Sequence, residues 1–240
     1  MREVFTRVEE NEKLIIEVDL EADSVKKDFP WLFSVFIKFD TQKATVELYE
    51  EFLETKESLI IALEYEQSVK YVGSRVYDGW NELYFYSSDS KELNSMAQAI
   101  LKESTYIHES NVVRDTKWGF YDKQLTPTEI EFYHMQSAKI ITALEEEGDD
   151  ILVERDVEYY IAFDTSTQKN RFINTLELEG FTFKDEISSD EFEHGVALIS
   201  KHNVTRETSQ EYVIKLLDAI KKEHGYYEGW STTLQNQEEL

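Results

Sequence analysis

The chain contains no cysteine, and of its 240 residues only two are proline and eight are glycine. The absence of cysteine excludes disulfides, thiolate metal ligands and cysteine nucleophiles. No apolar run approaches the roughly 18 residues that a membrane-spanning helix requires. The first ten residues also lack the basic-then-apolar layout of a signal peptide. We therefore expect a cytoplasmic protein that does not contact a membrane.

Positive charge is scarce relative to negative charge. The chain has 25 Lys and Arg residues against 50 Asp and Glu residues, which gives a formal net charge of -25. Residues 1–128 carry -10 and residues 129–240 carry -15, so the shorter half is the more acidic. A field of this sign repels nucleic-acid phosphates and attracts cationic partners. An acidic surface that serves only solubility is the alternative explanation.

Hydrophobic periodicity predicts a similar order of strands and helices in both halves. The elements predicted in the first half are strands at 14–20 and 31–39, a helix from about 44, a hairpin of strands at 69–77 and 82–86, a helix from Ser90 to about 102 and a strand at 106–113. Those predicted in the second half are a helix at 129–147, a strand at 157–163, a helix at 165–179, strands at 181–187 and 196–202, a helix at 205–224 and a strand at 226–234. Such interleaving predicts the α+β class, with two ferredoxin-like (βαββαβ) α/β sandwich domains and mainly antiparallel sheets.

The segment 118–128 has the features of a boundary between the two domains. It contains Pro127 within Thr-Pro-Thr-Glu, a typical helix start with proline at the first helical position. We therefore predict a first domain at 1–125 and a second at 126–240.

Residue types that carry catalysis do not form a recognisable motif. None of the five histidines is paired at the spacing of a helical metal site, and the glycines are isolated rather than gathered in a phosphate-binding loop. The sequence predicts no enzyme activity, no metal and no cofactor. A metal-dependent hydrolase built on carboxylates is the alternative that spacing alone leaves open.

An acidic run at 145–150 follows the first helix of the second half. Carboxylates at a helix C-terminus oppose the helix dipole, and a locally unfavourable charge cluster can mark a binding site. One interpretation is contact with a partner through Glu145, Glu146, Asp149 and Asp150. A solvated acidic end and a site for a hard cation such as calcium are the other two, although the run lacks the EF-hand pattern.

Aromatic residues gather near the C-terminus in Tyr226-Tyr227-Glu228-Gly229-Trp230. Such residues dominate both interface hot spots and cores. We expect Trp230 to pack in the core with its indole N–H hydrogen-bonded, and Tyr227 and Glu228 to lie at the surface. Tyr227, Glu228, Gly229 and Trp230 form the second candidate partner-binding group.

Three short motifs follow one another along the second half, and their order and spacing form a pattern. They are the acidic Gly-Asp turn at 144–150 ahead of the strand at 157–163, Glu179-Gly180-Phe181, and the closing Tyr227-Glu228-Gly229-Trp230. Over roughly 137–234 the chain resembles the family called regulator of ribonuclease E activity B (RraB), with Glu228 in place of the usual Asp. The resemblance implies a non-enzymatic protein that binds a ribonuclease and inhibits it.

The first half contains a different set of motifs. They are Pro30-Trp31-Leu32, Val72-Gly73-Ser74-Arg75, Tyr77-Asp78-Gly79-Trp80 and Tyr84-Phe85-Tyr86. This half resembles a bacterial domain of unknown function (family 695, DUF695) that is often fused to the regulator domain. The resemblance implies no activity.

The charge and the resemblance together favour a basic protein partner. We expect an acidic protein-binding regulator that inhibits a ribonuclease or another basic nucleic-acid enzyme and does not itself bind nucleic acid. An immunity protein that neutralises a toxin nuclease is the main alternative, because its partner would carry the same charge. The oligomeric state does not follow from the sequence.

Overall fold

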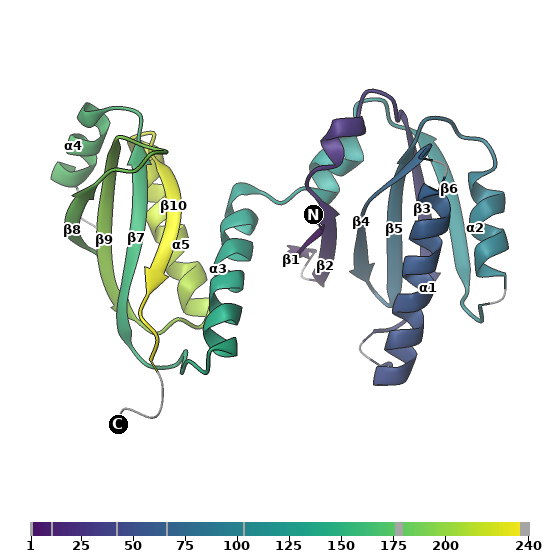
Figure 1. Ribbon diagram of the computed structural model, residues 1–240, viewed down its shortest axis with the longest axis horizontal. Helices are drawn as coiled ribbons and strands as arrows, with labels where there is room; N and C mark the ends of the chain where they lie inside the picture. The colour runs from purple at the N-terminus through teal and green to yellow at the C-terminus, as the bar shows by residue number, and fades with distance from the viewer. Residues whose placement is uncertain are drawn as a thin grey trace. The chain divides into compact units, whose positions relative to one another are not determined.

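The computed structural model describes residues 2–10, 12–41, 43–65, 67–102, 104–175 and 180–235. The chain folds into two compact units, residues 1–127 and 128–240. Each unit combines helices with one antiparallel sheet (Figure 1), which confirms the α+β class. Within the described ranges, no helix is long and apolar enough to cross a membrane.

The first unit is built on a six-stranded sheet in the order β1-β2-β4-β5-β3-β6. Its strands are Arg2–Glu9 (β1), Glu12–Asp19 (β2), Trp31–Lys38 (β3), Val69–Tyr77 (β4), Trp80–Ser87 (β5) and His108–Arg114 (β6), and its helices are Val46–Glu64 (α1), Leu93–Leu101 (α2) and the short turns Ala22–Val25 (η1) and Tyr121–Leu125 (η2). Strands β3 to β6 with α1 and α2 follow the predicted β-α-β-β-α-β order. The hairpin of β1 and β2 extends the sheet beside β4.

Local sequence signals explain how several of these elements begin and turn. The hydroxyl of Thr45 accepts a hydrogen bond from the N–H of Leu48 and so caps α1. Asp78 and Gly79 both have positive φ (45° and 74°), as the tight hairpin turn between β4 and β5 requires. Ser90 does not cap α2. That helix starts after Glu92, which adopts a left-handed conformation without a side-chain cap.

One part of the first unit differs from the prediction, and the predicted boundary segment is largely internal. The sequence pattern indicated no strand at residues 2–9, yet β1 pairs with β2 along its whole length. Residues 118–125, predicted at the end of the first domain, pack into it, because Trp118, Tyr121 and Leu125 are buried. Trp118 stacks on Tyr86 with ring centroids 3.9 Å apart, and the η2 segment packs on β2 and β4.

The second unit has a four-stranded sheet in the order β10-β7-β9-β8. Its elements are Glu129–Glu146 (α3), Arg155–Phe163 (β7), Ser166–Thr175 (α4), Thr182–Ile187 (β8), His194–His202 (β9), Arg206–Lys222 (α5) and Tyr226–Thr232 (β10). From β7 to β10 the order is the predicted β-α-β-β-α-β, with β7 and β9 in the centre. Residues 176–179 of the helix predicted at 165–179, and with them Glu179, lie outside the described residues.

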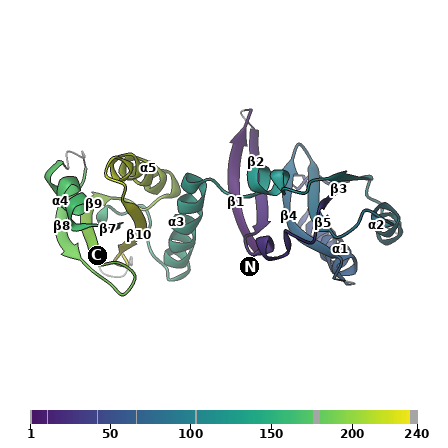
Figure 2. The same ribbon diagram turned by 90° about the horizontal axis from the view of Figure 1, so that it is seen from above.

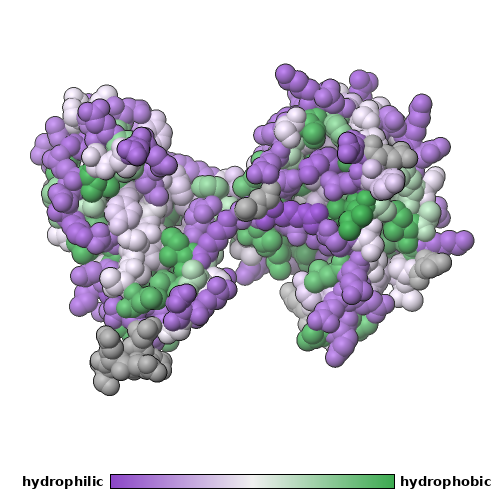
Figure 3. Space-filling view, in the orientation of Figure 1, coloured by the Kyte–Doolittle hydropathy of each residue, from purple (hydrophilic) through white to green (hydrophobic). Residues whose placement is uncertain are grey.

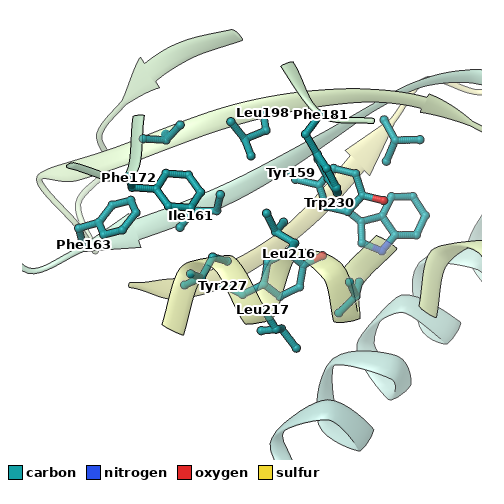
Figure 4. Close-up of a cluster of buried hydrophobic side chains, with 14 of the residues drawn as sticks. Tyr159, Ile161, Phe163, Phe172, Phe181, Leu198, Leu216, Leu217, Tyr227 and Trp230 are labelled. Carbon is teal, nitrogen blue, oxygen red and sulfur yellow. The ribbon is translucent and has the colours of Figure 1, made fainter. Parts of the chain in front are cut away.

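The core of the second unit lies between one face of its sheet and helices α3, α4 and α5, and Figure 4 shows many of its side chains. Tyr159, Ile161 and Phe163 alternate along β7 and face this core. Helix α3 packs on α5 and β10, and it starts with the capping box of Thr128 and Glu131. In the part of the chain that the structure describes, no helix covers the opposite face of the sheet (Figure 2).

Candidate functional site

The acidic run of the sequence lies at the end of α3 and in the turn after it. Glu145 and Glu146 are exposed in the last turn of this helix. That last turn contains no basic residue. Gly148 follows in a left-handed conformation (φ 81°), which glycine adopts without strain. Glu145 and Glu146 are therefore accessible to a partner.

Asp149 is an internal residue of the same turn. Its side chain is 0% exposed, and its Oδ2 lies 2.6 Å from Nη1 of the buried Arg155. The same carboxylate oxygen accepts a hydrogen bond from the backbone N–H of Gln235 (2.7 Å). A partner could reach Asp149 only by opening this ion pair, which corrects the expectation that Asp149 belongs to a contact surface.

Asp150 joins the turn to the C-terminal segment. Its N–H donates to the carbonyl of Gln235 (2.9 Å), and its Oδ1 accepts from the N–H of Leu152 (3.1 Å). Arg155 Nη2 donates to the carbonyl oxygen of Asp150. Among the described residues, no group of three or more His, Asp or Glu side chains could hold a metal ion. The turn is thus a structural connection with an exposed acidic helix end.

Tyr227 and Trp230 both point into the core of the second unit (Figure 4). Each is 5% exposed, and the Trp230 indole N–H donates to Ser137 Oγ at 3.0 Å. Tyr227 packs edge-to-face on Tyr133, with ring centroids 4.9 Å apart. The expectation that Tyr227 lies at the surface is therefore wrong, whereas Glu228 is exposed.

A β-bulge explains why these two aromatic side chains face the same way. In a regular strand, residues three apart point to opposite faces of the sheet. Here Tyr227 lies opposite Ile161 and Gly229 lies opposite Tyr160, so Glu228 is an extra residue on β10. The extra residue shifts the alternation, and Gly229 adopts a φ of 121°. As a result, Glu228 is left exposed between two residues that turn inward.

Four carboxylates line a hollow at the end of the sheet where β7 ends and β9 and β10 begin. The hollow has a volume of about 320 Å³. Its acidic residues are Asp164, Glu191, Glu193 and Glu228, and its other lining residues are Ala162, Phe163, Phe192, His194 and Tyr226. None of these described lining residues is Lys or Arg. We call these nine residues the acidic hollow. Figure 3 shows the uncovered sheet face of this unit, where hydrophilic surface surrounds a paler central strip.

The loop between β8 and β9 forms one wall of the acidic hollow. The N–H of Ser189 donates to the carbonyl of Phe192 (2.8 Å), and Ser189 Oγ accepts from the N–H of Glu191 (3.1 Å). Gly195 lets this loop fold back onto the sheet. A Cβ atom at Gly195 would lie 2.5 Å from the Phe192 ring and 2.8 Å from the Ile187 side chain, so only glycine fits there.

The acidic hollow concentrates negative charge that its own residues do not neutralise. Burial raises the pKa of Glu228, and the nearby carboxylate of Glu191 raises that pKa further. The Tyr226 hydroxyl donates to Asp164 Oδ2 at 3.2 Å, and this hydrogen bond raises the pKa of Tyr226. Carboxylates held together in this way create a negative potential that a Lys or Arg side chain would relieve.

Comparison with family sequence models identifies both units. The model described as Family of unknown function (DUF695) matches residues 4–126, about half of the chain. The chain belongs to the DUF695 family. A second model, described as Regulator of ribonuclease activity B (RraB), matches residues 134–232. This DUF695 protein therefore also carries an RraB domain, as the sequence motifs predicted.

One solved structure similar to the DUF695 protein is the crystal structure of an unknown protein from Galdieria sulphuraria. The two chains are 11% identical, and the match covers 85% of this chain and 98% of the other with a TM-score of 0.21. No curated protein matches the chain.

The acidic hollow lies inside the RraB domain, and most of it was missed in the sequence. Glu228 was predicted as a contact, whereas Asp164, Glu191 and Glu193 were not. The predicted order of strands could have indicated that these carboxylates lie together. Asp164 directly follows the predicted strand 157–163, and the two glutamates precede the strand that becomes β9. Because β7 and β9 are antiparallel neighbours, the end of one meets the start of the other.

Proposed function

We propose that this DUF695 protein is a non-catalytic regulator that binds a ribonuclease and lowers its activity. The description of the RraB family, regulator of ribonuclease activity, supports this function for the second unit. The observation that carries the proposal is the acidic hollow, where four carboxylates face solvent without a basic lining residue. Glu145 and Glu146 add a second exposed acidic group in the same domain.

A ribonuclease presents the complementary surface. Enzymes that bind RNA contact its phosphates with Lys and Arg side chains, and such side chains fit a hollow lined by Asp and Glu. A protein that occupies these basic residues competes with RNA for them and inhibits cleavage without making or breaking a bond. The net charge of -25 would also speed the encounter with a basic partner.

Capture of a ribonuclease from the native host tests the proposal. The full chain is immobilised, bound host proteins are identified by mass spectrometry, and each retained ribonuclease is purified and assayed with and without the chain. We expect at least one ribonuclease to be retained and inhibited. Because the contact is electrostatic, we expect its affinity to fall as salt is raised.

A pair of charge-neutralising variants locates the contact. Glu191→Gln with Glu228→Gln removes two charges from the acidic hollow and should weaken binding by about tenfold or more. Glu211→Gln with Asp218→Asn removes the same charge from exposed positions on α5, behind the sheet, and should change binding little. Equal binding by both variants, or capture of no ribonuclease by the unaltered chain, would contradict the proposal.

A further inference from the structure

Strand β1 is one of the two edge strands of the six-stranded sheet in the first unit. It pairs with β2 over all eight residues, Arg2 to Glu9, without a register shift. Its other side has no strand partner among the residues that the structure describes. An edge of this kind presents a row of N–H and C=O groups that can pair with another extended chain.

Two other sheet edges of the chain are interrupted by register shifts. Strand β8 has a register shift at Lys184, followed by Asp185 and Glu186. Strand β10 has the bulge at Glu228. A bulge is a usual device that blocks an edge. Edge strand β6 is regular but shorter, with seven residues, so β1 is the longest unbulged edge in the described ranges.

The two faces of β1 differ in how well they are covered. Phe5 points to one face and is buried. On the other face Val4 and Val8 are 57% and 71% exposed, with Thr6 exposed between them. Figure 3 shows hydrophobic patches on the face of the first unit that carries β1, β2 and α1. One face of the edge strand therefore presents two exposed apolar side chains.

A hollow of about 360 Å³ lies beside Val4, between the β1–β2 hairpin and α1. The apolar residues of its lining are Val4, Ile15, Phe52, Leu53 and Val76, with Tyr49 at α1. Its two charged lining residues pair with each other, since Lys56 Nζ lies 3.3 Å from Glu17 Oε2. We call this the hairpin hollow. With its charges paired internally, it suits an uncharged apolar side chain.

We propose that β1 binds an extended segment of a protein partner by strand addition, with one apolar side chain of that segment in the hairpin hollow. Backbone pairing supplies affinity in this mode, and pockets for alternate side chains supply specificity. Residues four apart in the added strand would lie beside Val4 and Val8, with the residue midway between them beside Thr6. The net charge of -10 of this unit favours basic residues flanking the apolar ones.

The site is independent of the proposed ribonuclease contact, because it lies in the DUF695 segment at residues 4–126. Its test is a selection of phage-displayed random peptides on the full chain, followed by binding measurements with the selected peptide made synthetically. We expect selected peptides to share apolar residues at alternate positions flanked by Lys or Arg. On binding, the amide hydrogens of β1 should exchange more slowly, which reports strand pairing directly.

Matched variants assign the binding to this edge. Val4→Glu and Val8→Glu should each lower the affinity for the peptide by about tenfold, because binding would desolvate the new carboxylate. Val113→Glu, the same change at an exposed position of β6 (43%), should leave the affinity unchanged. Far-ultraviolet circular dichroism would verify that all three variants fold.

Several results would overturn the proposal. One is a selection without a shared alternating pattern, and another is a consensus with helical spacing. Undiminished binding to Val4→Glu would exclude β1 as the site. A dimer in light scattering that dissociates in the Val4→Glu variant would assign the edge to a second copy of this chain instead.

Discussion

The carboxylates of the acidic run show how burial decides the role of a side chain. Asp149 and Glu146 are three residues apart and carry the same charge, but Asp149 is fully buried against Arg155 whereas Glu146 is exposed. A buried guanidinium needs this carboxylate, since an unpaired charge in a protein interior is costly. The run therefore combines one structural ion pair with an exposed acidic helix end.

Asp149→Asn should destabilise the second unit by about 3–5 kcal/mol, because it leaves the Arg155 charge buried without its partner. The measurement is urea unfolding, monitored through the indole N–H signal of Trp230. Trp230 is the single tryptophan of residues 128–240. Glu146→Gln, an exposed neighbour, is the control and should change the free energy of unfolding by less than about 0.5 kcal/mol. Equal stability of the two variants would mean that Asp149 does not stabilise the fold.

His202 is a second buried polar side chain with internal partners. It is 5% exposed and stacks on Tyr212 with ring centroids 3.9 Å apart. The carbonyl of Asn203 can only accept, so Nδ1 carries the proton and Nε2 accepts from the Tyr159 hydroxyl at 2.9 Å. This arrangement holds a neutral imidazole, and burial lowers the pKa of His202.

Stability should therefore fall as the pH drops from about 7.5 to about 5.5. The unfolded chain takes up a proton near the ordinary histidine pKa of about 6.5, whereas folded His202 resists it, so acid favours unfolding. Burial lowers the pKa of His134 as well, with the same sign. Urea unfolding of His202→Gln, monitored through the same indole signal, should show a smaller loss of unfolding free energy over this pH range. An unchanged pH dependence in this variant would show that His202 is not responsible.

Several helices and strands followed local signals of the sequence, although Ser90 does not cap α2. The structure has the Asp78-Gly79 turn. Helix α3 starts at Glu129 as predicted, but its cap is Thr128, so Pro127 lies before the helix and not at its first position. The alternation of strand and helix was also enough to predict the α+β class. These features depend on residues near one another in the chain, so the sequence pattern reports them directly.

Elements that depend on distant residues were not predictable in the same way. Strand β1 has weak alternation of its own and is held by pairing with β2. Residues 118–125 were predicted at the end of the first domain, but their burial was not predicted, because their packing partners, such as Tyr86, lie far away in the chain. The bulge at Glu228 reversed the expected direction of Tyr227. The acidic hollow joins three segments, so only strand order brings its carboxylates together.

The excess of negative charge acts on the whole chain, beyond any one site. Acidic residues outnumber basic ones 50 to 25, and like charges on a compact molecule repel one another. Surface ion pairs such as Arg2–Glu57 have half-exposed side chains. Each contributes about 0.2–1 kcal/mol, so such pairs offset little of the repulsion. Because the repulsion is the larger effect, salt should stabilise this protein by screening it.

The melting temperature should rise between about 0.01 M and about 0.5 M NaCl, since the Debye length falls from about 30 Å to only a few ångströms over that range. A variant in which exposed Glu50, Glu54, Glu207 and Glu211 are all changed to Gln separates screening from other effects of salt. It should melt above the unaltered chain at low salt, by a few degrees per kcal/mol gained, and the difference should shrink at high salt. If the variant and the unaltered chain differ in melting temperature by the same amount at both salt concentrations, local side-chain effects, not repulsion across the molecule, set the stability.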